Sequence, residues 1–294
     1  MAENRILPSR SAKSVTGLAI VVAIVLFAIV APFFTQNPRF SGNDAFLPPN
    51  VDHLLGTTKL GYDVLAQLAH GARGSLIVGV IAAAIAIVLS LIFGIFAGYA
   101  GGWTDEILSM GTNVMLVIPG LPLVMVIAVY AESRSIWLVA FILGITSWAG
   151  SAIVLRSQAR SLRSRDYVGA AQVAGERTFR ILLVEIMPNL LPLLAAQFLS
   201  ALILAILGEA GLSFLGLGPS GSITWGTMIT DANGGNAMSA GAWWWFVPPG
   251  LMIAVFGAGL SLVNFSIDEV VNPKLRVVAD PAVRRRAPKA GASA

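Results

Sequence analysis

The run SLIVGVIAAAIAIVLSLIFGIFAGY, residues 75 to 99, contains no charged side chain. About 20 apolar residues in a helix cross the roughly 30 Å hydrocarbon core of a bilayer, so this run is long enough to span a membrane. A backbone exposed to lipid must satisfy its hydrogen bonds within its own segment, which selects the α-helix. The run therefore predicts a transmembrane helix in an integral membrane protein.

The composition of the whole chain agrees with this prediction. Of the 294 residues, 56% are hydrophobic and 12% are charged, and the mean hydropathy of +0.79 is typical of membrane proteins rather than soluble domains. The chain has no cysteine and two histidines, which excludes disulfides and argues against a metal site. In a membrane protein, excess Lys and Arg marks cytoplasmic loops, so we expect no nucleic-acid partner.

Five further apolar runs bring the number of expected transmembrane helices to six. The first run, Val15 to Phe34, follows basic residues as in a signal peptide, but it is long enough to span and no small-residue cleavage site ends it. We therefore expect it to be retained. The fold class expected is an all-α integral membrane protein, whose remaining spans are residues 107–130, 136–155, 190–217 and 246–267.

The basic residues indicate how the chain is oriented. Three precede the first span, six lie within 156–180 and six within 274–289. With six spans these segments share one side, which the positive-inside rule makes the cytoplasm. Residues 103–106 should be a cytoplasmic connection too, although they carry acidic and no basic side chains, and the segment 218–245 should be external.

This orientation divides the chain into segments. The expected divisions are a cytoplasmic N-terminus (1–14), a first transmembrane helix (15–34), an external loop (35–73), a five-helix core (74–276) with a cytoplasmic loop (156–189), and a disordered cytoplasmic tail (277–294).

The cytoplasmic loop contains small residues at helical spacing. Tyr167, Ala170, Ala171 and Ala174 would form a smooth helix face that another protein could approach closely. Gly175 would then allow the chain to turn.

A second helical stretch is expected from Arg177 to Met187, ending before Pro188 because proline disfavours helix in the residue ahead of it. Its apolar face would consist of Phe179, Leu182, Leu183 and Ile186. The loop is thus predicted to form a helix, turn and helix that a soluble partner grips, with an ordinary amphipathic loop as the alternative.

Few residues suggest catalysis or ion transport. No lysine follows a glycine, so the chain has no phosphate-binding loop for ATP. Glu209 lies deep in an expected span, where a secondary transporter would need several ionisable groups, and we expect it to make a structural hydrogen bond at an interface or cavity. His53 and His70 lie in or beside the outer loop without a nucleophile or metal constellation, so we assign no catalytic residue.

Part of the cytoplasmic loop resembles the "EAA" loop of bacterial ABC importer permeases, through Gly169-Ala170-Ala171, Gly175 and Ile186-Met187-Pro188. In that family the loop forms coupling helices that sit in a cleft on the ATPase subunits. Gly169 stands where the pattern has Glu, which puts in doubt any salt bridge that this Glu makes in relatives. The resemblance implies a coupling role for Asp166, Tyr167, Gly169, Ala170, Ala171, Ala174, Gly175 and Pro188.

A second resemblance covers LLGTTKLGYDVLAQLAHGARGSLIVG, Leu54 to Gly79. It is similar to the signature LGTDxxGRDxxSRxxxGxRxSL of the dipeptide and oligopeptide permease subfamily, with Tyr62 in place of an Arg. Further similarities are GEAGLSFLGLG (208–218), WG (225–226) and NPKLR (272–276). The chain is identified as a member resembling the second membrane subunit.

The resemblance implies a type I ABC importer permease fold in the inner membrane of a bacterium. The implied partners are a homologous permease subunit, two ATPase subunits that use ATP and Mg²⁺, and an extracytoplasmic binding protein. The chain itself would be a pore-forming subunit without a cofactor. Peptides are the usual cargo, but NFSIDEVVNPKLR (264–276) is similar to the ending of members suspected of moving oligosaccharides, and other members carry nickel. These cargoes stay open, with an ion-coupled secondary transporter as the rival from another class.

Overall fold

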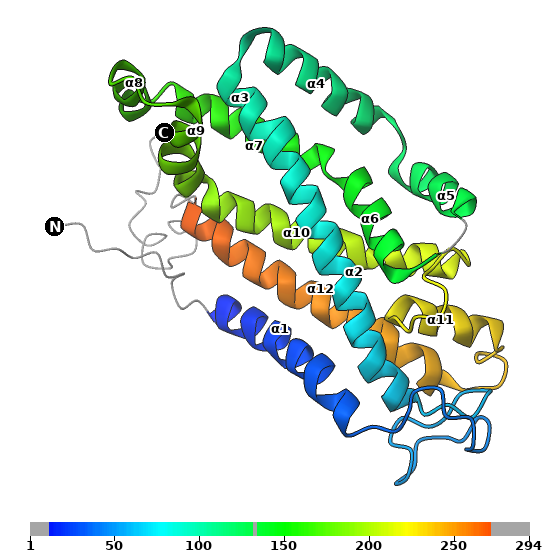
Figure 1. The fold of residues 1–294 in the computed structure, drawn as a ribbon. Coiled ribbons are helices and arrows are strands. Elements are labelled where there is room, and N and C mark those ends of the chain that lie inside the picture. The colour runs from blue at the N-terminus through cyan, green and yellow to red at the C-terminus, as the bar shows by residue number, and fades with distance from the viewer. Residues whose placement is uncertain (1–11, 132–133, 272–294) are drawn as a thin grey trace, which may run out of the picture.

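The computed structural model describes residues 12–131 and 134–271, and in those ranges the regular structure is helical (Figure 1). A single isolated bridge, between Thr57 and Asp63, is the strand-like exception there. The expectations for the first residues of the chain, the NPKLR match and the tail from 277 lie outside the described residues.

Four helical segments are long and apolar enough to cross a membrane: Lys13–Phe33, Val64–Ala100, Thr178–Phe214 and Trp243–Ile267. Two bent pairs raise the number to six if each is one span. In the first pair, α4 (Gly102–Val117) and α5 (Gly120–Tyr130) differ in direction by 84°; in the second, α6 (Ile136–Ser147) and α7 (Ala149–Arg163) differ by 46°. The chain is thus an all-helical membrane protein with four to six candidate spans.

The run expected to be one span at 107–130 is broken in the middle. Ile118 is extended, with φ −71° and ψ 124°, and Pro119 forms the N-cap of α5. Proline pushes the preceding residue out of the helical region, which explains why α4 ends at Val117. The expectation of a connecting loop at 103–106 is also wrong, because α4 begins at Gly102 and these residues form its first turn.

The expected external loop ends earlier than residue 73. Helix α2 (Val64–Ser90) begins after Asp63, whose Oδ1 accepts a hydrogen bond from the Ala66 N–H at 2.8 Å as a side-chain N-cap. Arg73 therefore lies in α2. Its guanidinium donates to the carbonyls of Ala28 and Ile29, both at 2.7 Å, and so caps the end of α1 (Ala12–Val30).

The expected external segment 218–245 also contains a helix, α11 (Trp225–Gly234). Thr224 and Thr227 form a capping box at its start, a local signal that favours helix initiation. The last helix, α12 (Trp243–Val271), begins three residues before the predicted span at 246.

The helix after the cytoplasmic loop does not end before Pro188, so that prediction is wrong. Helix α9 (Thr178–Arg180), the π-helical turn η3 (Ile181–Ile186) and α10 (Met187–Phe214) form one continuous segment. The Met187 N–H donates to the Leu182 carbonyl, five residues back. A π turn shifts the hydrogen-bond register by one residue, which accommodates the missing N–H of the proline.

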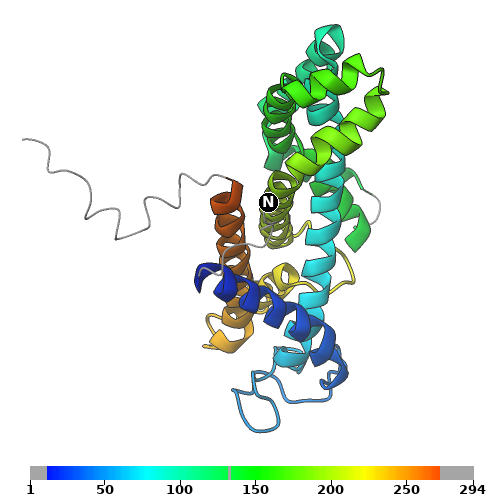
Figure 2. The same ribbon diagram turned by 90° about the vertical axis from the view of Figure 1, so that its left-hand side faces the viewer.

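The long helices pack side by side, with α1 against α12, and α10 against both α2 and α12. A second π-helical turn, η2 (Leu91–Phe96), extends α2 into the short α3 (Ala97–Ala100). The segment 35–63 gathers at one end of these helices, beside α11, and α8 (Asp166–Val173) projects at the other (Figure 1). Figure 2 again places that segment at one end of the long helices. We call the end that carries the segment 35–63 the loop end, and the opposite end, where α8 projects, the α8 end.

Candidate functional site

Helix α8 is anchored along one side. Val168 is fully buried and the half-buried Ala171 packs against the same cluster, which also includes Tyr99, Ile181 and Leu190. Because these positions are three residues apart, they occupy one face of the helix and fix which face points outward.

The outward face is apolar and differs from the expected one at two positions. Tyr167 and Ala170 are exposed as expected, whereas Ala171 is turned toward the protein. Val173 joins the exposed face with 92% of its surface accessible. The sequence analysis missed Val173, although its spacing of three from Ala170 was a usable signal. The outward face of α8 consists of Tyr167, Ala170, Val173 and Ala174.

The turn after α8 confirms the prediction for Gly175. Its φ of +77° lies in the left-handed region, which glycine adopts without strain. The Gly175 N–H donates to the Gln172 carbonyl at 3.0 Å, and the Glu176 N–H donates to the Ala171 carbonyl at 3.1 Å. This pair of hydrogen bonds is a Schellman motif, which ends a helix and sets the direction of the next segment.

Side-chain contacts of α8 with the rest of the chain are long. The Asn189 Nδ2 donates to the Tyr167 hydroxyl at 3.4 Å, and the Gln172 Nε2 donates to the Tyr99 hydroxyl at 3.3 Å. Asp166 lies exposed in the first turn, where a negative charge favours the helix dipole.

Gly169 and Pro188, two further predicted coupling residues, also contribute no side chain to the outward face. A Cβ added at Gly169 would meet no other atom within 4 Å, so space does not explain the missing Glu. Pro188 is exposed and lies two residues after η3, in the first turn of α10. Pro188 therefore belongs to the helix that follows the turn at Gly175, where it lies next to the π-helical turn η3.

An ion pair that sequence analysis missed holds α4 against α7. Asp105 is buried and accepts two hydrogen bonds from Arg156, at 2.5 Å from Nε and 2.8 Å from Nη2. Ser109 adds a weaker contact at 3.4 Å, and Arg160 lies 3.9 Å away. The acidic residues at 103–106, noted as an exception to the charge pattern, were the available signal.

Glu209 is fully buried within the chain, between α10 and α11, rather than at its surface. Its Oε1 accepts hydrogen bonds from Ser213 and Thr224, both at 2.6 Å, and its Oε2 has no partner among the described residues. A Cβ at Gly226 would lie 2.7 Å from the Ala210 Cα and about 3 Å from the carboxylate. Glycine at 226 therefore permits the close approach of α11 to Glu209.

Signature residues at the loop end also make buried contacts. The Trp225 N–H donates to Ser75 Oγ at 2.9 Å, and the Trp244 Nε1 donates to the Thr57 carbonyl at 3.1 Å. A Cβ at Gly56, where φ is +67°, would lie 2.5 Å from the Leu47 carbonyl oxygen. The signature thus joins the segment 35–63 to α2, α11 and α12.

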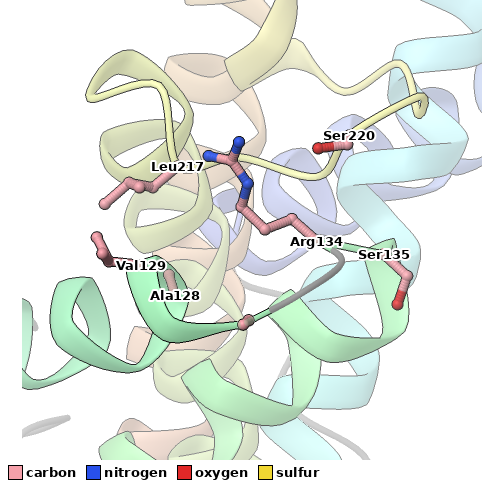
Figure 3. Close-up of a pocket in the computed structure, with 7 residues that line it drawn as sticks. Ala128, Val129, Arg134, Ser135, Leu217 and Ser220 are labelled. Atoms are coloured by element: carbon pink, nitrogen blue, oxygen red, sulfur yellow. The ribbon is translucent and has the colours of Figure 1, made fainter.

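A cavity of about 580 Å³ opens between the end of α5, the start of α6 and the segment after α10. Figure 3 shows the side chain of Arg134 reaching between Leu217 and Ser220. Arg134 donates to the Gly216 carbonyl, and the Ser220 N–H donates to the Arg134 carbonyl at 2.7 Å. In the described ranges, no group of three or more His, Cys, Asp or Glu side chains could hold a metal ion.

Two family models match the chain. Residues 90–277 match the binding-protein-dependent transport system inner membrane component, and residues 10–49 match the N-terminal transmembrane domain of oligopeptide transport permease C. Both resemblances drawn from sequence motifs point to the same family.

Curated relatives are similar over most of their length. The oligopeptide transport system permease protein OppC of Bacillus subtilis is 34% identical over 266 residues, which cover 90% of this chain and 86% of that protein. The dipeptide transport system permease protein DppC of the same organism is 32% identical, covering 90% and 82%. OppC of Mycobacterium tuberculosis is 29% identical over 277 residues, covering 93% and 94%.

Proposed function

This chain belongs to the inner membrane components of binding-protein-dependent transport systems, and from that premise we propose how it takes part in import. It is a multi-pass permease subunit of the bacterial inner membrane, it binds no cofactor itself, and ATP hydrolysis lies in separate subunits. We propose that it forms half of a translocation pathway for oligopeptides or dipeptides, the cargo for which its relatives OppC and DppC are named.

The proposed assembly contains a homologous permease subunit, two ATPase subunits and an extracytoplasmic binding protein. The oligosaccharide alternative depends on the ending 264–276, of which the last five residues lie outside the described part of the chain. Peptides are therefore the cargo that we carry forward. An affinity measurement on the cognate binding protein with peptide and sugar panels would decide between the two classes.

The outward face of α8 is the observation that supports a coupling role. Val173 is exposed almost completely, and it lies beside Tyr167, Ala170 and Ala174 on a helix whose other face is fixed to the protein. An apolar patch of this kind on a polar, basic loop is typical of a surface that a partner covers. We assign that partner as an ATPase subunit, with α8 inserted in its cleft.

The proposed orientation places the α8 end in the cytoplasm. The basic segment 156–180 includes α8, and the segment 35–63 lies at the opposite end of the long helices (Figure 1). The positive-inside rule then makes the loop end extracytoplasmic, where it faces the binding protein.

A bulky side chain on the outward face tests the coupling role. Ala170 is exposed, so Ala170→Trp should leave the fold intact while obstructing the cleft at a cost of about 1–3 kcal/mol, as overpacking does in a core. We expect ATPase subunits to bind about tenfold more weakly, or worse, with loss of substrate-stimulated hydrolysis.

The matched control is Ser161→Trp, at an exposed position in α7. Purified complexes should retain their ATPase subunits in this variant. If the Ala170→Trp complex kept a full complement of ATPase subunits and wild-type stimulated hydrolysis, the coupling role of α8 would have to be abandoned.

A further inference from the structure

A groove of about 560 Å³ runs between two helices near the α8 end. One wall is η2, and the other is the start of the helix that begins at Thr178. Its lining is apolar apart from Thr178, and it includes Ile92, Ile95, Phe96, Phe179, Leu182 and Leu183.

Both walls contain a π-helical turn. These turns, η2 and η3, contribute residues to the same buried cluster and to the groove. A π turn widens the helix by one residue, changes the direction of the side chains along it, and occurs frequently at functional sites. The groove is therefore formed by two local departures from regular helix that meet at one place.

The groove is open to the surroundings of the protein. Ile92 is 50% exposed, Phe96 43% and Phe179 71%. Both walls belong to segments long and apolar enough to cross a membrane. An apolar occupant from the bilayer can therefore reach the groove laterally.

The end of the groove at Thr178 adjoins a helix N-terminus and an arginine. Thr178 begins a continuous helix of 37 residues, whose first N–H groups have no carbonyl partner within the helix. Arg177, the residue before it, is exposed, and among the described residues no ion pair includes it. Arg180 is different because it pairs with Glu176. An arginine, a hydroxyl and a helix N-terminus together suit a phosphate group.

We propose that this groove binds an anionic phospholipid, with an acyl chain between the two π turns and the phosphate at Thr178 and Arg177. The charge complementarity selects a phospholipid over an apolar segment of a protein partner, which would leave the positive end without a counter-charge. In the proposed orientation the lipid belongs to the cytoplasmic leaflet. The inference does not depend on the cargo or on α8 binding an ATPase subunit.

The lipid would lie close to the turn at Gly175. Only two residues separate Gly175 from Thr178, so a bound headgroup would restrain the point where the chain re-enters the membrane. The phospholipid composition of the membrane would therefore influence the orientation of α8.

The test uses the purified permease complex, equilibrated with phosphatidylglycerol or phosphatidylcholine, and counts the retained phospholipids by native mass spectrometry. Leu183→Trp fills the groove at a position that is 45% exposed. Its matched control is Val184→Trp, 51% exposed on the same turn but outside the lining. Arg177→Gln removes the charge, and Arg165→Gln removes an exposed arginine before α8 as its control.

We expect Leu183→Trp to reduce retention of the bound lipid about tenfold, because the side chain displaces CH₂ groups of the acyl chain. Arg177→Gln should reduce the preference for phosphatidylglycerol over phosphatidylcholine about fivefold, the contribution of one basic residue near anionic lipid. Both controls should behave as wild type.

Three outcomes would overturn the proposal. Leu183→Trp and Val184→Trp could retain the lipid equally, or phosphatidylglycerol could be retained no better than phosphatidylcholine in the wild-type complex. A cysteine at Phe179 could also cross-link to the partner permease, which would show that a protein covers the groove.

Discussion

At the loop end, short hydrogen bonds join buried groups of different helices, whereas at the α8 end two long hydrogen bonds join part-exposed side chains. The contacts of Glu209 with Thr224, and of Ser75 with the Trp225 N–H, are shorter than 3 Å and hidden from solvent. Those of Tyr167 and Gln172 are 3.4 and 3.3 Å long. A buried hydrogen bond is costly to lose because its partner stays desolvated, and an exposed one is replaced by water.

This difference teaches what the motifs at the two ends are for. At the loop end, the signature glycines and hydroxyls allow close packing, so they specify the fold. At the α8 end, the small residues leave a helix face uncovered, so they are available to a partner. Substitutions should therefore damage folding at one end and coupling at the other.

Labelling of single cysteines gives the largest expected effect because it is all or none. Ser239, between α11 and α12, and Ser161, near the end of α7, are both exposed, and the chain has no native cysteine. In intact cells an impermeant maleimide should label Ser239→Cys fully and Ser161→Cys not at all. The reverse pattern would invert the orientation on which the comparison of the two ends depends.

Glu209→Leu should be the most damaging of the stability variants. It leaves the Ser213 and Thr224 hydroxyls buried without their acceptor, at a cost of about 1–3 kcal/mol for each. The midpoint of thermal unfolding of the detergent-solubilised subunit should be much lower than that of the wild type. The variant should also assemble poorly with its partner subunits. Glu209→Gln keeps an acceptor and should stay close to wild type.

The same Gln variant separates a structural role from ion transport. If it assembled normally but lost transport in a way that tracked pH, Glu209 would be an ion-coupling group. The secondary-transporter alternative would then return, and the loop end could no longer be regarded as purely structural.

Gly175→Val should moderately weaken the coupling of the permease to ATP hydrolysis. A β-branched residue at φ +77° is strained by about 1–3 kcal/mol, although no atom lies within 4 Å to clash with it. We expect α8 to be reoriented and substrate-stimulated ATP hydrolysis to fall, while the permease pair still assembles. Gly169→Ala is the control, since it adds a methyl group in open space and raises helix propensity by up to about 1 kcal/mol.

The smallest effect is expected for Tyr167→Phe. It removes only the hydroxyl that accepts the 3.4 Å hydrogen bond from Asn189, so the unfolding free energy should change by less than about 0.5 kcal/mol. Trp244→Phe at the loop end removes a buried donor to the Thr57 carbonyl and should cost about 1–3 kcal/mol. Equal effects of the two variants in chemical denaturation would remove the contrast between the ends.

Sequence patterns predicted the features that depend on neighbouring residues. The apolar runs located the long helices, and the spacing of small residues before Gly175 located α8 and its turn. Both depend on local physics: burial of an apolar segment in lipid, and the freedom of glycine to adopt positive φ.

The features that were missed depend on contacts between distant segments or on competing local signals. Pro188 was expected to end a helix, but η3 absorbs its missing N–H. The acidic residues at 103–106 were a local signal, but the partner of Asp105, Arg156, is 51 positions away and the local sequence does not identify it. The spacing of Val173 from Ala170 made it a candidate for the outward face of α8, but only the packing of Ala171 against the cluster of Tyr99 and Ile181 shows which of the two faces outward.

The helix from Thr178 to Phe214 begins three positions after Gly175 and ends near the Thr224 cap of α11. At 1.5 Å per residue its 37 residues extend about 55 Å, well beyond the thickness of the hydrocarbon core. A rigid helix of that length that tilted about its midpoint would move its two ends in opposite directions. A tilt of about 10° around its midpoint would displace each end by about 5 Å. A displacement of the end next to α8 would therefore reach the end next to α11 in the opposite direction.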